Sequence, residues 1–271
     1  MYESHFQLNE PPFEGRAPSR YFFASDMHQG ALLKLRYVVE QRPGAAVLAG
    51  APGLGKTMLI HLLSQQLPTE ISPRIHLVFP QMPASELVAY LAAELATTDI
   101  EDSSTMDQNV RSIRRSLADN SRRGRHAVIV IDEVHLITDI ASLETLRLLL
   151  NFETDNCPDL TLLLVGQTGI LSTLKKLPAL NDRIAIRCIL KRLSADETLA
   201  YVGHRVSEAG GPRDLFEPAA VEAIHHFSQG SPRKINRLAD LALLLAYAEQ
   251  HSTITASHIE AVAEDLSVGV G

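Results

Sequence analysis

The sequence predicts an α/β fold, in which a parallel sheet is covered by helices on both faces, followed by a small all-helical domain. Short, almost wholly aliphatic runs alternate with stretches of helical periodicity up to residue 193. These runs lack the polar alternation of a strand with one solvated face, which is typical of strands buried on both faces. After Leu193 the aliphatic runs stop and only helical patterns follow. The chain therefore combines two structural classes in succession.

Five aliphatic runs are predicted to be the strands of one sheet. They span residues 45–49, 75–79, 127–131, 160–165 and 184–190. Helices are predicted at 56–67, 86–95 and 143–152, and one more carries Met106, Val110, Ile113 and Leu117 on its inner face. Helices that alternate with strands in this way connect parallel neighbours.

The two ends of the chain have different characters. The first 24 residues are rich in proline and aromatic residues and are predicted to form an irregular arm packed on the core. Ser194 and Glu197 form a capping box, and further helices follow at 218–227, 233–249 and 256–266. We therefore expect an arm at 1–24, an α/β domain at 25–193 and a helical domain at 194–271.

Composition limits the classes of function. The chain carries a net charge of −7 and no tryptophan, which disfavours binding of nucleic acid through an overall basic field or by base stacking. Its two cysteines, Cys157 and Cys188, lack metal-ligand spacing, as expected in a reducing cytoplasm. The longest apolar run, 241–248, is too short to span a bilayer, so we expect a cytoplasmic protein without an integral membrane segment.

A phosphate-binding motif lies between the first predicted strand and the next helix. Residues 50–57 read Gly-Ala-Pro-Gly-Leu-Gly-Lys-Thr and fit the pattern G-x-x-x-x-G-K-[ST] in full. The glycines let backbone N–H groups turn toward phosphates, the lysine reaches the β- and γ-phosphates, and the threonine hydroxyl binds Mg²⁺. The residues predicted to bind the nucleotide are Gly50, Ala51, Pro52, Gly53, Leu54, Gly55, Lys56, Thr57 and Met58, with Asp132.

Two carboxylates follow the aliphatic strand at 127–131. Carboxylates at the end of a buried strand cost free energy unless they bind a charged partner such as a metal ion or take part in catalysis. Asp132 would bind Mg²⁺ together with Thr57, directly or through water, and Glu133 would act as the general base for the attacking water. The structural alternative is a helix cap at the strand end. With the loop upstream, the pair predicts binding of ATP or GTP.

With these residues assembled, the chain resembles the AAA+ ATPases of the ExeA/GspA type, the general secretion pathway protein A-like group. That group is similar to the TnsC/TniB transposition regulators and to the origin-recognition branch. The resemblance covers essentially the whole chain, and its most specific stretches are Leu146–Glu153 and Gly230–Asn236. It implies a P-loop NTPase sandwich with a helical lid, ATP and Mg²⁺ as ligands, ATP hydrolysis, and assembly into a homo-oligomeric ring or filament.

The resemblance also assigns catalytic residues outside the phosphate loop. Gln167, after the strand at 160–165, matches the sensor-1 position, although turns favour polar residues in any case. Arg233 matches sensor 2, which contacts the γ-phosphate of its own subunit, and Arg183 matches the arginine finger, which reaches a neighbour's nucleotide. Guanidinium groups suit both tasks because they stay charged and bind phosphate through two nitrogens. Arg187 could serve as the finger in place of Arg183. The structural alternative for Arg183 and for Arg233 is a surface ion pair.

The chain departs from its relatives in two places. Relatives carry an Asn after the second strand, which restrains the catalytic glutamate; here residues 79–81 read Phe-Pro-Gln. The restraint is therefore absent, moved to Gln81 or made differently. Secretion-type relatives often continue into a membrane span and a periplasmic peptidoglycan-binding domain, whereas this sequence ends at Gly271, so a wall-facing part of that role is not expected.

Two classes of partner remain open. The first is a protein partner in a secretion or envelope machine. The second is duplex DNA, as for a transposition regulator that forms ATP-dependent oligomers on it. A basic helix face could bind phosphates, and in a symmetric assembly it would repeat into a continuous track; a solvated or subunit-interface face is the alternative. That face carries Arg111, Arg114, Arg115 and Arg122.

Overall fold

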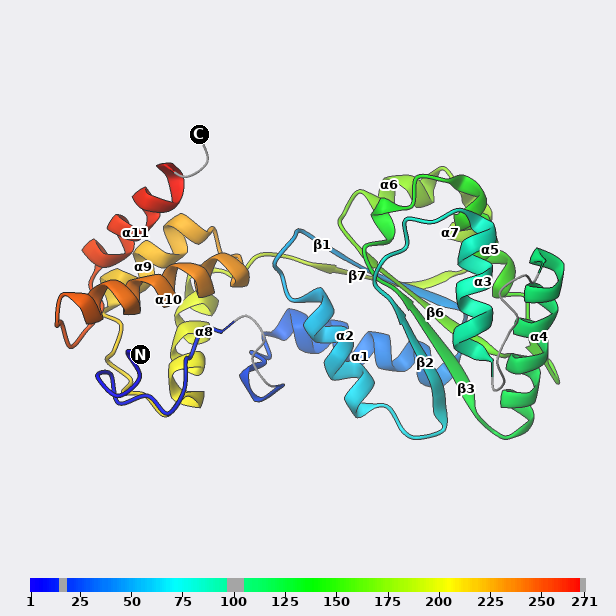
Figure 1. Ribbon diagram of the computed structural model, residues 1–271, viewed down its shortest axis with the longest axis horizontal. Helices are drawn as coiled ribbons and strands as arrows, with labels where there is room; N and C mark the ends of the chain where they lie inside the picture. The colour runs from blue at the N-terminus through cyan, green and yellow to red at the C-terminus, as the bar shows by residue number, and fades with distance from the viewer. Residues whose placement is uncertain (15–18, 97–104, 269–271) are drawn as a thin grey trace. The chain divides into compact units, whose positions relative to one another are not determined.

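The computed structural model describes residues 1–14, 19–96 and 105–268, and the chain divides into two compact units (Figure 1). One unit, called here the helical unit, contains Met1–Asp26, Gly53–Met58 and Lys191–Gly271. The other, called the sheet unit, contains Met27–Pro52 and Leu59–Leu190. No helix among the described residues is both long enough and apolar enough to cross a bilayer.

The sheet unit is built on five parallel strands in the order β2-β3-β6-β1-β7. The strands are β1 (Ala45–Gly50), β2 (Ile71–Leu77), β3 (His126–Ile131), β6 (Leu160–Gly166) and β7 (Ile184–Leu190). The predicted α/β class with a parallel sheet is thereby confirmed. The prediction for β2 was displaced toward the C-terminus, because Val78 and Phe79 leave the sheet and are 61% and 66% exposed.

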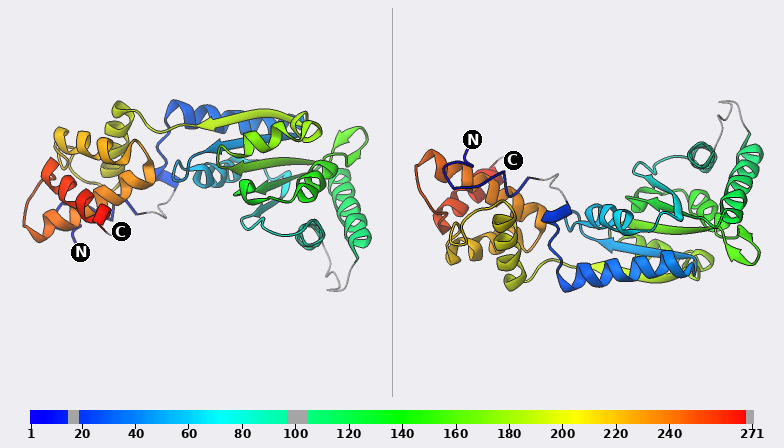
Figure 2. Two further views of the ribbon diagram at one scale, coloured as in Figure 1. Left: turned by 90° about the horizontal axis from the view of Figure 1, so that it is seen from above. Right: turned by 90° about the horizontal axis from the view of Figure 1, so that it is seen from below.

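The sheet is buried on both faces. Every residue of β1, β3 and β6 is buried, and successive side chains on a strand point to opposite faces. Val47, Ile129 and Leu162 belong to one apolar cluster with side chains from α3, α4 and α5, and the residues between them face the other side. In Figure 2 the blue helix α1 and the teal helix α3 lie on opposite sides of the strands.

Among the described residues, seven helices belong wholly or mainly to this unit. They are α1 (Asp26–Gln41), α2 (Lys56–Gln66), α3 (Ala84–Leu95), α4 (Met106–Arg122), α5 (Ile140–Leu149), α6 (Ile170–Lys175) and α7 (Pro178–Asn181). The predicted helix at 143–152 begins earlier because Asp139 caps it, accepting from the N–H groups of Ala141 and Ser142. Met106 does not lie on the inner face of α4 as predicted; it follows the cap residue Thr105 and is 46% exposed.

Three short elements complete the sheet unit. They are the 3₁₀ turn η2 (Val134–Leu136) and the two-residue strands β4 (Glu153–Thr154) and β5 (Cys157–Pro158). Strands β4 and β5 pair antiparallel with each other in a separate small sheet.

The helical unit contains the turn η1 (Ser19–Tyr21) and the helices α8 (Ala195–Glu208), α9 (Pro218–Ser228), α10 (Pro232–Ala248) and α11 (Ala256–Val268). The predicted capping box opens α8: Ser194 accepts from the N–H of Glu197, whose carboxylate accepts from the N–H of Ser194. One apolar cluster joins these helices to side chains from the start of the chain, among them Tyr2, Phe6 and Phe13.

Arg205 anchors the start of the chain to α8. Its guanidinium is buried and donates to the carbonyls of Pro12 (2.6 Å) and Glu14 (3.1 Å). The same group lies 4.6 Å from the centre of the Tyr21 ring. Cation–π contact and hydrogen bonds together satisfy a charge that would otherwise be costly to bury.

Candidate nucleotide-binding site

Three neighbouring strands of the sheet unit end at one edge, and predicted site residues follow each of them. Gly50 is the last residue of β1, and Ala51 and Pro52 follow it. Asp132 follows β3, and Gln167 follows β6. The strands are in register, with Ala49 opposite Gly166 and Ile131 opposite Leu164. Open parallel sheets bind ligands at the carboxyl ends of their strands. The structure therefore brings these predicted residues to a common edge.

Asp132 is held in place through its backbone N–H and through Oδ1 of its carboxylate. It is 2% exposed, and its backbone N–H donates to the carbonyl of Leu77 on β2 at 2.8 Å. Its Oδ1 accepts from the N–H of Glu133 at 2.8 Å, and its Oδ2 lies 3.4 Å from Nε2 of His76. A buried carboxylate oxygen and a threonine hydroxyl are hard ligands of the kind that Mg²⁺ prefers. The chemistry of Asp132 and Thr57 thus fits the predicted metal.

Glu133 has an unusual backbone conformation. Its φ of 49° and ψ of 33° lie in the left-handed region, which residues other than glycine rarely adopt. Its side chain is 43% exposed, so the carboxylate is accessible to water. Strained backbone concentrates where function requires a side chain to be aimed, and this conformation turns the chain away from β3 directly after Asp132.

His135 also lies at this edge of the sheet, although no motif in the sequence indicates it. Its Nδ1 lies 3.3 Å from Oε2 of Glu133 and 3.3 Å from the backbone nitrogen of Gln167, which donates to it. One ring nitrogen thus faces both the predicted general base and the predicted sensor-1 residue. With its proton on Nε2 the ring accepts from Gln167, whereas with a proton on Nδ1 it donates to Glu133.

Gly166 makes this approach of His135 to β6 sterically feasible. A β-carbon at residue 166 would lie 3.2 Å from Nδ1 and 3.3 Å from the backbone nitrogen of His135, and 3.1 Å from a methyl group of Val134. The glycine before Gln167 is therefore the sequence signal that could have indicated a close neighbour at this strand end.

The phosphate loop contacts the start of α10 within the helical unit. The carbonyl of Gly53 accepts from the N–H of Arg233 at 3.2 Å. Gly53 has a φ of 80°, and a β-carbon there would lie 2.8 Å from Cβ of Arg233 and 3.1 Å from Oγ of Ser231. Lys56 opens α2 and is 7% exposed. The structure therefore places the sensor-2 candidate beside the loop.

Arg183 and Arg187 lie away from the carboxyl edge of the sheet. The carbonyl of Arg183 accepts from the N–H of Ala45, the first residue of β1, about 17 Å from the last residue of that strand. Arg183 donates to Oδ1 of Asn151 at 2.7 Å, and Arg187 to Oδ1 of Asn181 at 2.9 Å. Both side chains are exposed, and neither forms an ion pair with a described carboxylate. The structure does not bring them together with Asp132.

The region that departs from the relatives forms a shallow cavity of about 400 Å³. Gln81 is exposed and makes no hydrogen bond to Glu133 in the described part of the chain. The group that contacts the Glu133 carboxylate is instead the His135 ring. The cavity is lined by Pro80, Gln81, Met82, Pro83, Leu136, Ile137, Thr138 and Asp139.

The four arginines of α4 are all exposed, but their local pairing differs. Nε of Arg111 lies 3.0 Å from Asp107, and Nη1 of Arg122 lies 2.8 Å from Asp119, both on the same helix. Arg114 and Arg115 form no ion pair with any described carboxylate. These two are therefore the least neutralised charges of the predicted basic face.

Comparison with known proteins supplies a family for this arrangement. A family model described as an AAA domain matches residues 39–174. The chain is 34% identical over 270 residues to general secretion pathway protein A of Aeromonas hydrophila, covering 98% of this chain and 49% of that protein. It thus spans about half the length of the curated relative it matches. These matches confirm the resemblance inferred from the motifs.

Solved structures share the fold. The Aeropyrum pernix ORC2 protein, solved as ADPNP–ADP complexes, has a TM-score of 0.73 at 14% identity, covering 94% of this chain and 71% of that one. Drosophila ORC bound to DNA has a TM-score of 0.70 at 14% identity, with 96% and 64% covered. At this identity the likeness is one of fold.

Proposed function

The chain belongs to the AAA domain family, and we propose that it binds ATP with Mg²⁺, hydrolyses it, and couples the nucleotide state to assembly of a homo-oligomer. The observation that carries the proposal is the edge at which Gly50, Asp132 and Gln167 end or follow three adjacent strands. A phosphate-binding loop, a buried carboxylate and an accessible glutamate at one sheet edge are the parts that phosphoryl transfer to water requires.

In this proposal each residue of the nucleotide site has one task. Residues 50–57 hold the phosphates through backbone N–H groups and Lys56, while Thr57 and Asp132 hold the cation, which when bound neutralises phosphate charge. Glu133 orients the attacking water and accepts its proton, and Gln167 fixes that water beside the γ-phosphate. Arg233 contacts the γ-phosphate of its own subunit, with residues 194–271 acting as the lid.

Arg183 completes the site of a neighbouring subunit. Its position at the amino edge of the sheet and its exposed guanidinium support this role. A positioned arginine stabilises charge that develops in the transition state, and its loss typically costs about 10³-fold in rate. Arg187, an exposed arginine of β7 that likewise donates to an asparagine side chain, is the control.

Four variants test the mechanism by separating ATP binding from ATP hydrolysis. Lys56→Ala abolishes ATP binding, and Glu133→Gln binds ATP but blocks hydrolysis and traps the oligomer. Arg183→Ala binds normally and fails to hydrolyse, whereas Arg187→Ala keeps its rate. Equilibrium binding of a fluorescent ATP analogue and phosphate release measure both steps. If Arg183→Ala hydrolyses ATP at the native rate, Arg183 is not the arginine finger. If Arg187→Ala loses hydrolysis instead, Arg187 is the finger.

The similarity to general secretion pathway protein A supports a protein partner in a secretion or envelope machine. We place this activity in the cytoplasm, since the free cysteines Cys157 and Cys188 suit a reducing compartment.

A second candidate partner is duplex DNA. The observation that favours it is the exposed pair Arg114 and Arg115 on α4, which no described carboxylate neutralises. The test is sedimentation of the Glu133→Gln protein with ATP at moderate salt, with and without duplex DNA. Assembly that needs DNA and weakens in Arg114→Ala/Arg115→Ala supports the DNA role. Assembly indifferent to DNA supports the protein-directed role.

A further inference from the structure

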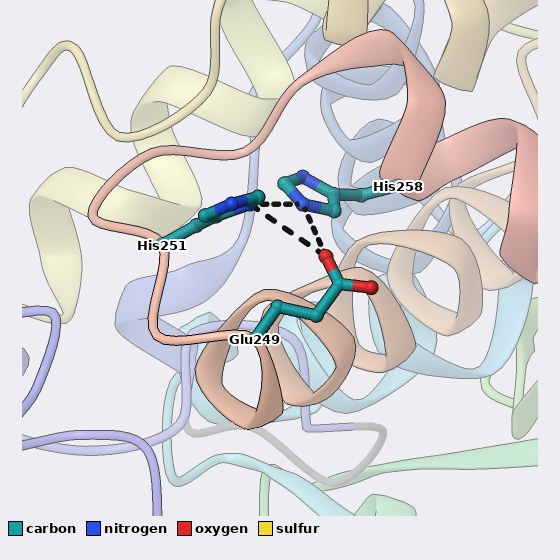
Figure 3. A group of neighbouring side chains, drawn as sticks. All are labelled: Glu249, His251 and His258. Carbon is teal, nitrogen blue, oxygen red and sulfur yellow. Dashed lines mark hydrogen bonds and ion pairs between the residues drawn. The ribbon is translucent and has the colours of Figure 1, made fainter.

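A second group of metal-ligating side chains lies in the helical unit, at the corner between α10 and α11. Glu249 caps the C-terminus of α10, His251 lies in the loop that follows, and His258 lies in the first turn of α11. Figure 3 shows the two rings and the carboxylate pointing toward one another. The proposed functions of the nucleotide site use none of the three residues, which we call the corner triad.

The ligand atoms of the corner triad form a small triangle. Nδ1 of His251 lies 2.8 Å from Nε2 of His258, and this Nε2 lies 3.2 Å from Oε2 of Glu249. The third side, from Nδ1 of His251 to Oε2 of Glu249, measures 3.6 Å. Among the described residues, this is the group whose histidine, cysteine and carboxylate atoms converge in this way.

A hydrogen bond from the backbone fixes the proton of His258. The N–H of Thr255 donates to Nδ1 of His258 at 3.0 Å, in the manner of a capping box whose third helical residue is histidine. Because Nδ1 accepts, the proton of the neutral ring lies on Nε2 and points into the triangle. The proton on Nε2 of His258 is therefore directed at two acceptors, Nδ1 of His251 and Oε2 of Glu249.

We propose that the corner triad binds Zn²⁺ in place of this proton. Tetrahedral zinc with bonds of about 2.05 Å to histidine nitrogen and carboxylate oxygen separates its ligands by about 3.3 Å, and the three observed sides bracket this value. Two imidazoles and one carboxylate suit zinc rather than Mg²⁺, which prefers oxygen ligands. A water molecule completes the fourth position.

The threonine beside His258 can accommodate the change of tautomer that zinc requires. When Nε2 binds the ion, the ring proton moves to Nδ1, where Oγ1 of Thr255 lies 3.1 Å away and can accept it. The N–H of Thr255 then gives up its hydrogen bond to Nδ1, a cost that the zinc–nitrogen bond has to offset. A hydrogen bond on the second nitrogen is the usual support of a metal-binding histidine.

Burial and exposure in the triad suit a site that exchanges with solvent. His258 is 4% exposed, whereas Glu249 and His251 are both exposed, so an ion reaches the triad from the water side. Bound zinc links the end of α10 to the start of α11. It therefore stabilises the folded helical unit according to the concentration of free ion.

The test uses the full chain, treated with a chelator and free of nucleotide. Zinc binding is followed by calorimetry with ZnCl₂, and its geometry by the visible absorption of Co²⁺, which is far stronger for tetrahedral than for octahedral coordination. We expect a wild-type site of one ion per chain, a rise in the unfolding midpoint with Zn²⁺ but not with Mg²⁺, and a tetrahedral Co²⁺ spectrum. Imidazole ¹⁵N shifts of His258 report the change of tautomer.

The variants His251→Ala and Glu249→Gln each remove an exposed ligand and leave the Thr255–His258 cap in place. We expect each to weaken zinc binding at least about tenfold, while the control His226→Ala, an exposed histidine of the same unit, binds as the wild type does. Lys56→Ala also binds zinc normally, since the triad is independent of the nucleotide site. Equal zinc affinity in the triad variants, or an octahedral Co²⁺ spectrum, would overturn the proposal.

Discussion

Replacing Gly53 by alanine tests the contact between the phosphate loop and α10. Gly53 has a φ of 80°, and its carbonyl accepts from the N–H of Arg233. A β-carbon at this position would meet Cβ of Arg233 at 2.8 Å, a distance at which one of the two backbones has to shift. We therefore expect Gly53→Ala to destabilise the helical unit.

The magnitude follows from two separate costs. A β-carbon in the left-handed region costs about 1–2 kcal/mol, and overpacking of a tight contact costs about 1–3 kcal/mol more. The expected loss in the free energy of unfolding is thus about 2–5 kcal/mol. Gly30 is the matched control, because it lies in α1 with no atom within 4 Å of an added β-carbon. Gly30→Ala is expected to gain about 0.5–1 kcal/mol.

The assay is urea denaturation of the nucleotide-free chain, followed by far-UV circular dichroism because the chain has no tryptophan. The midpoint of the transition is expected to fall for Gly53→Ala and to rise slightly for Gly30→Ala. If Gly53→Ala unfolds at the same urea concentration as the wild type, the loop does not contact α10 in solution. Equal losses of stability in Gly53→Ala and Gly30→Ala would show that the loss comes from replacing any glycine and not from the contact with α10.

Three further predictions concern other described residues. Burial lowers the pKa of His126 to about 4, below its ordinary value of about 6.5, so stability is full above pH 6.5 and is lost as the pH falls toward 4. Between pH 7 and pH 5 the wild type should lose about 2 kcal/mol more unfolding free energy than His126→Gln; equal pH profiles would contradict this. Arg205→Ala removes a buried guanidinium and takes its hydrogen bonds from the carbonyls of Pro12 and Glu14. It should cost about 2–3 kcal/mol by urea denaturation, whereas a loss below about 0.5 kcal/mol would be typical of an exposed side chain. His135→Ala frees the carboxylate of Glu133 and should raise basal ATP turnover about tenfold at unchanged ATP affinity, with His135→Asn near the wild-type rate; a fall in turnover would refute restraint by His135.

The sheet could be predicted because burial on both faces leaves a strong pattern. Strands such as Ala127–Ile131 are aliphatic throughout, and β7 was predicted with its observed bounds. Exposed apolar residues caused the error at β2, since hydrophobicity alone does not distinguish Val78 at a strand end from a buried position. The same pattern misled the prediction for Met106.

The carboxyl-edge residues could be predicted because each has a local signature, a glycine-rich loop or an acidic pair after a strand. His135 has none: its relation to Glu133 and Gln167 depends on the left-handed turn at Glu133 and on the missing side chain of Gly166. The corner triad escaped prediction for a similar reason. Its residues are close in sequence, but only the turn from α10 into α11 aims their ligand atoms at one point.

The discontinuity of the helical unit has a consequence for biosynthesis. Tyr2, Phe6 and Phe13 pack against helices that the ribosome makes later than the sheet unit, which is complete in the nascent chain once Leu190 has emerged. Until residues 191–271 have been made, the aromatic side chains of residues 1–14 therefore stay exposed to water. During this interval those side chains are exposed to chaperones and to other nascent chains. A bulky protein fused before Met1 is therefore expected to lower first the efficiency with which helices α8–α11 fold.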